Sequence, residues 1–137
     1  MTGNATVVGS MGADGDMSAM AFNSVGTLFV IDTTAGANRL LTVDVNTGAI
    51  SSSQPLSVNL GGASGMAFDL NGNCYVGGGG GGTASLYSLD TSSGTLTPIG
   101  MLGIPDRLSG LSFQSVPEPS SMLLSSAFCW ILRKRLS

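Results

Sequence analysis

Histidine is absent from this chain of 137 residues, and charged side chains make up only 9% of it. Without an imidazole, the chain itself offers no histidine base, no Ser-His-Asp triad and no histidine-ligated metal. Its two cysteines, Cys74 and Cys129, are too few for a disulfide framework. Cys74 lies in an apparent strand, where we expect it to be a small buried apolar side chain. The sequence therefore predicts no catalytic residue, no metal site and no cofactor.

Positive charge is scarce in residues 1–116, which carry two arginines against seven aspartates. Nucleic-acid binding depends on neutralising phosphates, so we do not expect this body to bind nucleic acid. The balance reverses in residues 117–137, where three basic side chains outnumber Glu118. The N-terminal stretch MTGNATVVGSMGADG lacks the basic start and the apolar core of about 7–15 residues that mark a signal peptide.

Glycine, serine and threonine are abundant instead. The chain contains 21 glycines, well above the roughly 7% of average proteins. These three residue types form helices poorly and are common in turns. The composition therefore favours an all-β fold of short strands joined by tight turns.

An internal repeat with a period of 46 residues organises the body. Residues 18–50 align with residues 64–96 without a gap, and ten of the 33 positions are identical. The segment SAMAFNSVGTLFV lies over SGMAFDLNGNCYV, and RLLTVDVNTGAI lies over SLYSLDTSSGTL. A shift of 91 places residues 3–24 over residues 94–115. The chain therefore holds two full repeats and a partial unit at each end.

Each full repeat, about 18–63 and 64–108, is predicted to form four short strands. Met20 and Phe22 alternate with alanines, a pattern that suits sheets stacked closely face to face. Four strands in a period of this length are typical of a β-propeller blade. The strands expected in the first repeat are Ser18–Asn23, Thr27–Ile31, Arg39–Val45 and Ala49 to about Leu60.

The segment SGMAFDLNGNCYV…SLYSLDTSSGTLTPIG resembles the blades of bacterial β-propellers, whose repeats read S-G-L-A-F-D-x-x-G-x-L-Y … L-Y-x-I-D-x-x-T-G-x-x-T-x-I-G. The resemblance covers residues 3–115 of a body that we place at 1–115. It implies a partial β-propeller of about two and a half four-stranded blades, whereas a closed propeller has about 4–8. Three explanations for the shortage stay open. The chain is an N-terminally truncated fragment, which we favour; several chains complete a ring; or the repeats form a smaller, non-propeller β-structure.

The ending VPEPSSMLLSSAFCWILRKRLS differs from the body in composition. Two prolines favour an extended, accessible triplet. The basic cluster after the apolar run is expected to stay in the cytoplasm by the positive-inside rule. The triplet is Pro117, Glu118 and Pro119, and the basic cluster is Arg133, Lys134 and Arg135. The apolar run within residues 120–132 contains Met122, Leu123, Leu124, Phe128, Trp130, Ile131 and Leu132.

These three parts, in this order at the end of the chain, resemble the PEP-CTERM sorting signal of exopolysaccharide-producing Gram-negative bacteria. The resemblance assigns residues 116–137 to the signal and residues 120–132 to a short C-terminal hydrophobic helix that enters the membrane. It implies cleavage near the triplet by an exosortase, a membrane-embedded transpeptidase-like enzyme. The protein would reside transiently in the inner membrane and then reach the cell surface or the extracellular matrix. The alternative is an ordinary helix packed on the body, since a helix of this length spans about 20 Å and a bilayer core about 30 Å.

Charged side chains also occur in two equivalent loops between repeats. In a propeller such loops lie on one face near the central channel, where ligands usually bind. We therefore take four residues as candidate ligand-face residues, with solvated turns as the alternative. They are Asp14, Asp16, Asp106 and Arg107.

Other conspicuous loops have structural explanations. Gly77–Gly82 is expected to be an inter-strand loop, because a phosphate-binding loop would need a helix N-terminus after it. Asp69–Asn73 (DLNGN) favours a hairpin turn over a calcium loop, because its glycine is at the wrong position. Asp44 and Asp90 precede NTG and SSG, where an Asx-type turn accounts for them.

Together these features favour a non-enzymatic, exported surface or matrix protein with a binding or scaffold role. Its expected partners are an exosortase, the membrane, and exopolysaccharide or other surface components. The alternative is a fragment of a propeller enzyme, a hydrolase or lyase, whose catalytic residues lie in missing blades. A degenerate gene whose product has no function is a third hypothesis.

Overall fold

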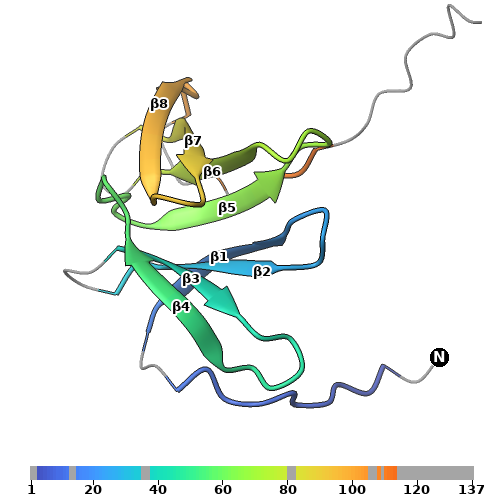
Figure 1. The fold of residues 1–137 in the computed structure, drawn as a ribbon. Coiled ribbons are helices and arrows are strands. Elements are labelled where there is room, and N and C mark those ends of the chain that lie inside the picture. Colours follow the sequence, from blue (N-terminus) through green and yellow to red (C-terminus); the bar gives the residue numbers. More distant parts are fainter. Residues whose placement is uncertain are drawn as a thin grey trace, which may run out of the picture.

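Two four-stranded antiparallel sheets, one from each repeat, make up most of the described chain (Figure 1). The computed structural model describes residues 3–12, 15–34, 38–79, 83–104, 108 and 110–113. The first sheet contains β1 (Met17–Phe22), β2 (Leu28–Asp32), β3 (Arg39–Val43) and β4 (Ile50–Pro55). The second contains β5 (Ala63–Phe68), β6 (Cys74–Gly78), β7 (Ser85–Asp90) and β8 (Thr95–Met101). Strands that are consecutive in sequence are neighbours in each sheet, so both sheets are simple meanders.

The expected all-β fold with four strands in each repeat is confirmed, and the strand bounds differ by a few residues. The largest difference is in β4, which was expected to reach about Leu60 and ends at Pro55. Pro55 pairs with Arg39, the first residue of β3. Beyond Pro55, the N–H of Leu56 donates to the carbonyl of Asn38, just before β3, and the N–H of Ser57 turns to the carbonyl of Gly94 in the second repeat.

The hairpin turn predicted at Asp69–Asn73 is also confirmed. Asp69 Oδ1 accepts hydrogen bonds from the backbone N–H groups of Asn71 (2.9 Å) and Asn73 (2.8 Å). Gly72 has a φ of 86°, in the left-handed region that glycine adopts without strain. Asn23, 46 residues earlier, caps the β1–β2 turn in the same way. The side chain of Asp69 is therefore used by the turn.

Two further aspartates close turns as the sequence predicts. Asp44 Oδ1 accepts from the backbone N–H of Asn46 (2.8 Å), and Asp90 Oδ1 accepts from that of Ser92 (2.9 Å). The bond from the Asn46 N–H is the main reason that the pKa of Asp44 lies below its usual value. Hydrogen bonds from Ser92 and Ser93 lower the pKa of Asp90 to about 2. Both carboxylates thus serve local turns.

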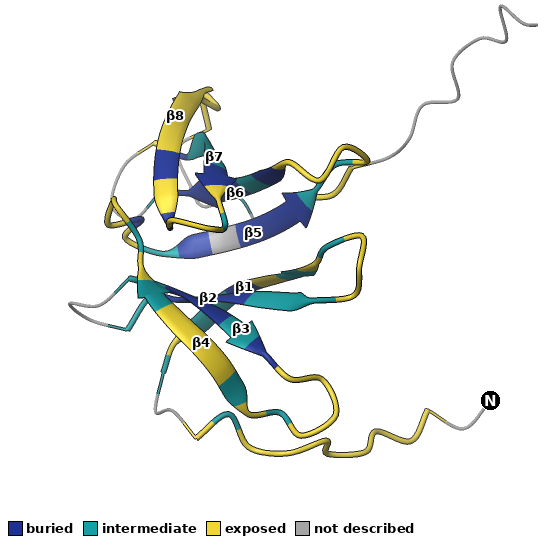
Figure 2. Ribbon diagram, in the orientation of Figure 1, coloured by how far each residue is buried: buried dark blue, intermediate teal, exposed yellow. Residues whose placement is uncertain are grey.

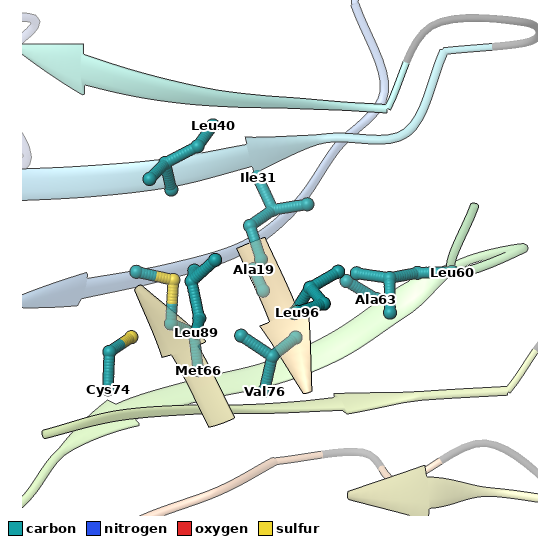
Figure 3. Packing of buried hydrophobic residues seen from close by; sticks show 10 residues of the cluster. All are labelled: Ala19, Ile31, Leu40, Leu60, Ala63, Met66, Cys74, Val76, Leu89 and Leu96. Atoms are coloured by element: carbon teal, nitrogen blue, oxygen red, sulfur yellow. The ribbon is translucent and has the colours of Figure 1, made fainter. Parts of the chain in front are cut away.

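The main hydrophobic core lies between the two sheets (Figures 2 and 3). β1 and β5 lie side by side in the middle of the molecule, and β4 and β8 lie on the outside (Figure 1). Cys74 belongs to this core with 3% of its surface exposed, which confirms the expected buried position. The buried members are Ala19, Ile31, Leu40, Leu60, Ala63, Met66, Cys74, Val76, Leu89 and Leu96.

The prediction that Gly77–Gly82 is entirely a loop is wrong for its first two residues. Gly77 and Gly78 are buried and form the end of β6, paired with β7. A Cβ at Gly77 would press on the side chain of Leu108, and a Cβ at Gly78 on that of Leu60. Two leucines therefore fill the space that side chains at these positions would take.

Short segments at the two ends of the described chain cover the outer faces of the sheets. Residues 110–113 lie on the second sheet, where the Phe113 ring contacts Tyr75 with a centroid separation of 4.8 Å. Residues 3–12 run past the β3–β4 turn, and Gly9 lies against the backbone of Thr47 and Gly48. The outer face of the first sheet holds a second, smaller apolar cluster of Val30, Leu41 and Val43, with Met11, Met17, Leu28 and Ile50 packed against it.

Candidate functional site

Asp16 is the one residue of the four predicted ligand-face residues that lies within the described part. Asp14, Asp106 and Arg107 fall outside the described residues. The sorting and membrane residues also fall outside them: Pro117, Glu118, Pro119, Met122, Leu123, Leu124, Phe128, Trp130, Ile131, Leu132, Arg133, Lys134 and Arg135. The geometry described below therefore concerns the end of the first sheet near Asp16.

Asp16 is exposed and is fixed through its backbone to the segment that follows β2. Its N–H donates to Thr34 Oγ1 (2.9 Å), and its carbonyl accepts from the N–H of Thr33 (2.9 Å). The segment before β1 is thereby held beside the end of β2. This leaves the Asp16 carboxylate directed toward solvent at the edge of a polar cluster.

A buried ion pair forms the centre of that cluster. Asp32 ends β2 and is fully buried, and its Oδ2 accepts from Nη2 of Arg39 at 2.6 Å. Asp32 and Arg39 are cross-strand partners in the β2–β3 ladder, so the sheet register itself brings the two charges together. Asp32 Oδ1 accepts from the backbone N–H (2.9 Å) and the hydroxyl of Thr34. Both oxygens of the carboxylate therefore have hydrogen-bond donors.

The environment of Asp32 acts on its pKa in two opposite directions. Burial disfavours the charged form and would raise the pKa, while the hydrogen bonds from Thr34 and the contact with Arg39 lower it. The donors prevail, so the pKa of Asp32 lies below its usual value and the group is ionised at neutral pH. Arg39 keeps 41% of its side chain exposed. The pair therefore joins a fully buried carboxylate to a partly exposed arginine side chain, whose Nε is buried with no hydrogen-bond partner among the described residues.

This ion pair occurs in one repeat only. The positions 46 residues after Asp32 and Arg39 are Gly78 and Ser85, which carry no charge. Sequence reasoning missed the pair because it followed features that recur. The available signals were a charged residue at the end of an apolar strand and the scarcity of arginine in the body.

A cavity of about 230 Å³ lies where the first strands of the repeats meet. β1 and β5 contribute to its wall, and residues 110–111, which align with the first-strand positions of a third repeat, complete it. The residues around it are Met17, Ser18, Ala19, Met20, Gly65, Met66, Gly110 and Leu111. Met17 is also the cross-strand partner of Asp32. The polar cluster and the cavity are thus neighbours at one end of the first sheet.

The side chains at this site are suited to binding. Ser18 Oγ lies 3.0 Å from Thr33 Oγ1 and 3.5 Å from the carbonyl oxygen of Ile31, and neither partner is a general base. Among the residues that the structure describes, no three His, Cys, Asp or Glu side chains gather as a metal site would require. Hydroxyls, one guanidinium and exposed backbone are instead groups that hydrogen-bond polar ligands.

No helix within the described ranges, which exclude residues 120–132, has the length and apolar character to cross a bilayer. No protein-family model matches the chain, and no curated protein is similar to it.

Proposed function

We propose that this protein is an exported, non-enzymatic surface or matrix-associated protein with a binding or scaffold body and a PEP-CTERM sorting tail. The observation that carries the proposal is the order of three features at the end of the sequence. The Pro117–Pro119 triplet comes first, the apolar run 120–132 follows, and the basic residues 133–135 come last. Each has a distinct physical role: an accessible cleavage site, a membrane segment and a cytoplasmic stop.

The proposed route has the tail hold the chain in the inner membrane until an exosortase cleaves near the triplet. The body is then released to the cell surface or the extracellular matrix, where exopolysaccharide or other surface components are its proposed partners. The acidic body favours such a location over one on nucleic acid, since residues 1–116 carry only two arginines against seven aspartates.

For the body we infer an incomplete β-propeller in which each sheet is one blade. Support comes from the position of β1 and β5, which lie side by side as the innermost strands of adjacent blades would. Residues 110–111 line the same cavity and match the first strand of a third repeat. On this view the cavity is part of a central channel. Asp14, Asp16, Asp106 and Arg107 would then surround its mouth as ligand-face residues.

Expression of the full chain, fused to an N-terminal export signal and a C-terminal epitope tag, in a Gram-negative host that contains an exosortase tests the sorting proposal. The body is expected in the surface or medium fraction without the tag. Glu118→Ala and Pro119→Ala should leave the tag attached and the protein in the inner membrane. Pro105→Ala, which changes a proline outside the triplet, is the matched control and should be processed normally. A cytosolic, tagged product from the unaltered chain would exclude the proposal.

A further inference from the structure

The outer face of the first sheet has an apolar groove that the rest of the chain does not fill. The groove has a volume of about 350 Å³, and its wall comes from β1, β2, the end of β3 and the N-terminal segment. Met20 and Phe22 project from β1 at this face, with 58% and 57% of their surfaces exposed. Exposed apolar side chains gathered in this way mark an interaction surface.

The 46-residue repeat shows what kind of surface covers such a face. The second sheet has the same set of positions, and there they are packed against the first sheet. Met66 is the counterpart of Met20 and is only 4% exposed. The full set of counterparts is Met20 and Met66, Phe22 and Phe68, Leu28 and Cys74, Val30 and Val76, Leu41 and Tyr87, and Val43 and Leu89. Met20 and Phe22 are therefore left without a covering sheet where Met66 and Phe68 are packed, while Val30, Leu41 and Val43 are buried against Met11, Met17 and Ile50 of the same chain.

The covering surface within the chain is the small-residue face of the first sheet. There Ala19 and Ala21 leave room for Met66 and Phe68, and the Phe29 ring lies 5.6 Å from that of Phe68. The second sheet carries the same face 46 residues later. Its members are Gly65, Ala67, Tyr75 and Gly77. A second copy of this chain thus offers a surface of the shape that the groove requires.

We propose that copies of this chain associate head to tail, with the outer face of the first sheet in one copy packed on the outer face of the second sheet in the next. Met20 and Phe22 of one copy take the places that Leu111 and Phe113 hold on its neighbour. These are corresponding positions, 91 residues apart. The inferred contact repeats the sheet-to-sheet interface that the chain already contains.

The chain's own end segments occupy these faces in the single copy. Phe113 stacks on Tyr75, and Leu111 lies against Gly65. Residues 3–12, which align with β8, lie beside the groove on the first sheet. These segments form no strand, and Val7 and Val8 are 88% and 61% exposed. The contacts of Met11, Leu111 and Phe113 that are lost when the segments move aside are replaced by contacts with the partner's sheets. On association, β1 of one neighbouring copy replaces residues 110–113 on the second sheet. On the first sheet, β8 of the other neighbouring copy replaces residues 3–12.

A head-to-tail contact leaves one free face at each end of the assembly, so growth continues beyond a dimer until a ring closes. Pairing of two identical grooves is disfavoured by shape, because it would place Met20 and Phe22 of one copy against Met20 and Phe22 of the other. The interface within the chain instead packs large side chains onto alanines. The proposal rests on the sheets alone and is independent of the sorting tail.

Sedimentation velocity of the full chain in a mild detergent, over a wide concentration range, tests the proposal. The unaltered chain is expected to form species larger than a dimer. Phe22→Lys places a charge in the groove, and Tyr75→Lys places one on the opposite face; each should weaken association by about tenfold or more. Leu70→Lys is the control, since Leu70 is 82% exposed and does not line the groove. All variants keep the tail, so any association through it is common to them.

A mixture of the two variants separates head-to-tail from symmetric pairing. Phe22→Lys chains retain an intact second sheet, and Tyr75→Lys chains retain an intact first sheet, so the mixture should form dimers and nothing larger. Phe113→Ala should strengthen association several-fold, because it removes the side chain that covers Tyr75. Circular dichroism establishes that each variant is folded.

Three results would overturn the proposal: a monomeric unaltered chain at every concentration, unchanged association of folded Phe22→Lys and Tyr75→Lys, or a mixture of these variants that yields no dimer. Loss of association in Phe22→Lys alone, with Tyr75→Lys unaffected, would show groove-to-groove pairing and would also exclude it.

Discussion

The rings of Phe29 and Phe68 lie 5.6 Å apart, centroid to centroid, across the boundary between the two sheets. Tyr75 and Phe113 repeat this contact at 4.8 Å, with each residue displaced by one repeat along the chain. Both pairs are tilted by a similar angle, 44° and 45°. A tilted aromatic pair therefore occurs at corresponding positions in both places.

Replacing Phe68 by alanine should destabilise the protein markedly. The change removes a half-buried ring from the interface between the sheets and leaves a cavity beside Phe29, so we expect a loss of about 2–3 kcal/mol in the free energy of unfolding. Urea denaturation of dilute protein, followed by circular dichroism, measures it. Phe22→Ala alters the same residue type at the same repeat position, on a face that no sheet covers. Phe22→Ala should lower the free energy of unfolding by less than about 1 kcal/mol. Equal losses of stability in Phe68→Ala and Phe22→Ala would contradict this account.

Gly65 and Gly100 should respond oppositely to substitution by alanine. A Cβ at Gly65 would lie 2.7 Å from the backbone nitrogen of Leu111, whereas one at Gly100 would have no heavy atom within 4 Å. Gly65→Ala should therefore push residues 110–113 away from β5, at a cost of about 1–3 kcal/mol. Gly100→Ala should be neutral or slightly stabilising, because alanine lowers the entropy of the unfolded chain. NMR contacts between the rings of Phe113 and Tyr75, whose centroids lie 4.8 Å apart, would report the displacement, and unchanged contacts in Gly65→Ala would refute it.

The strands could be predicted from the sequence because each follows from residues that recur. Gly26 and Gly72 fix equivalent hairpin turns, and the alternation around Met20 and Met66 fixes which face is large. The alignment of Phe113 with Phe22 and Phe68 also predicts the start of a third unit, but residues 110–113 form no strand. Local turn chemistry and side-chain alternation are short-range properties, so the sequence carries them directly.

The Asp32–Arg39 pair could not be predicted in this way, because it depends on the register of β2 against β3 across an intervening loop. The strand conformation of Gly77 and Gly78 was also not predicted from the sequence. Glycine has no strand preference of its own, and only the distant leucines at positions 60 and 108 explain why nothing larger fits there. Both features arise from contacts that are remote in sequence and that a periodic pattern does not encode.

Asp32→Asn tests the buried ion pair through the pH dependence of stability. The pKa of Asp32 is lowered on folding. Its contribution to the free energy of unfolding is therefore fully present above the ordinary aspartate pKa of about 3.9, and it is lost as the pH falls through the lower pKa of the folded state. At neutral pH the variant should be about 1–3 kcal/mol less stable. That deficit should shrink on acidification below about pH 4. Urea titrations at several pH values measure both curves, and parallel curves would show that Asp32 does not titrate as described.

Arg39→Gln provides a reciprocal test of the same pair. It removes the cation but retains a side chain that can donate a hydrogen bond to Asp32. Because Arg39 is 41% exposed, water screens part of its interaction, and the loss of stability should be smaller than for Asp32→Asn. The double variant, compared with both single variants, isolates the coupling between the two residues. Strict additivity would mean that the ion pair contributes nothing to stability.

Cys74 should be inert to thiol reagents while the protein is folded. Burial raises the pKa of its thiol to about 12, and the thiolate, which is the reactive form, is then roughly one part in ten thousand at pH 8. The variant Cys129→Ser leaves Cys74 as the only thiol in the chain. We expect no reaction with iodoacetamide at pH 8 in buffer and stoichiometric alkylation in concentrated urea, with mass spectrometry as the measurement. Rapid alkylation without urea, in a sample whose circular dichroism is native, would show that the core between the two sheets opens far more readily than its burial implies.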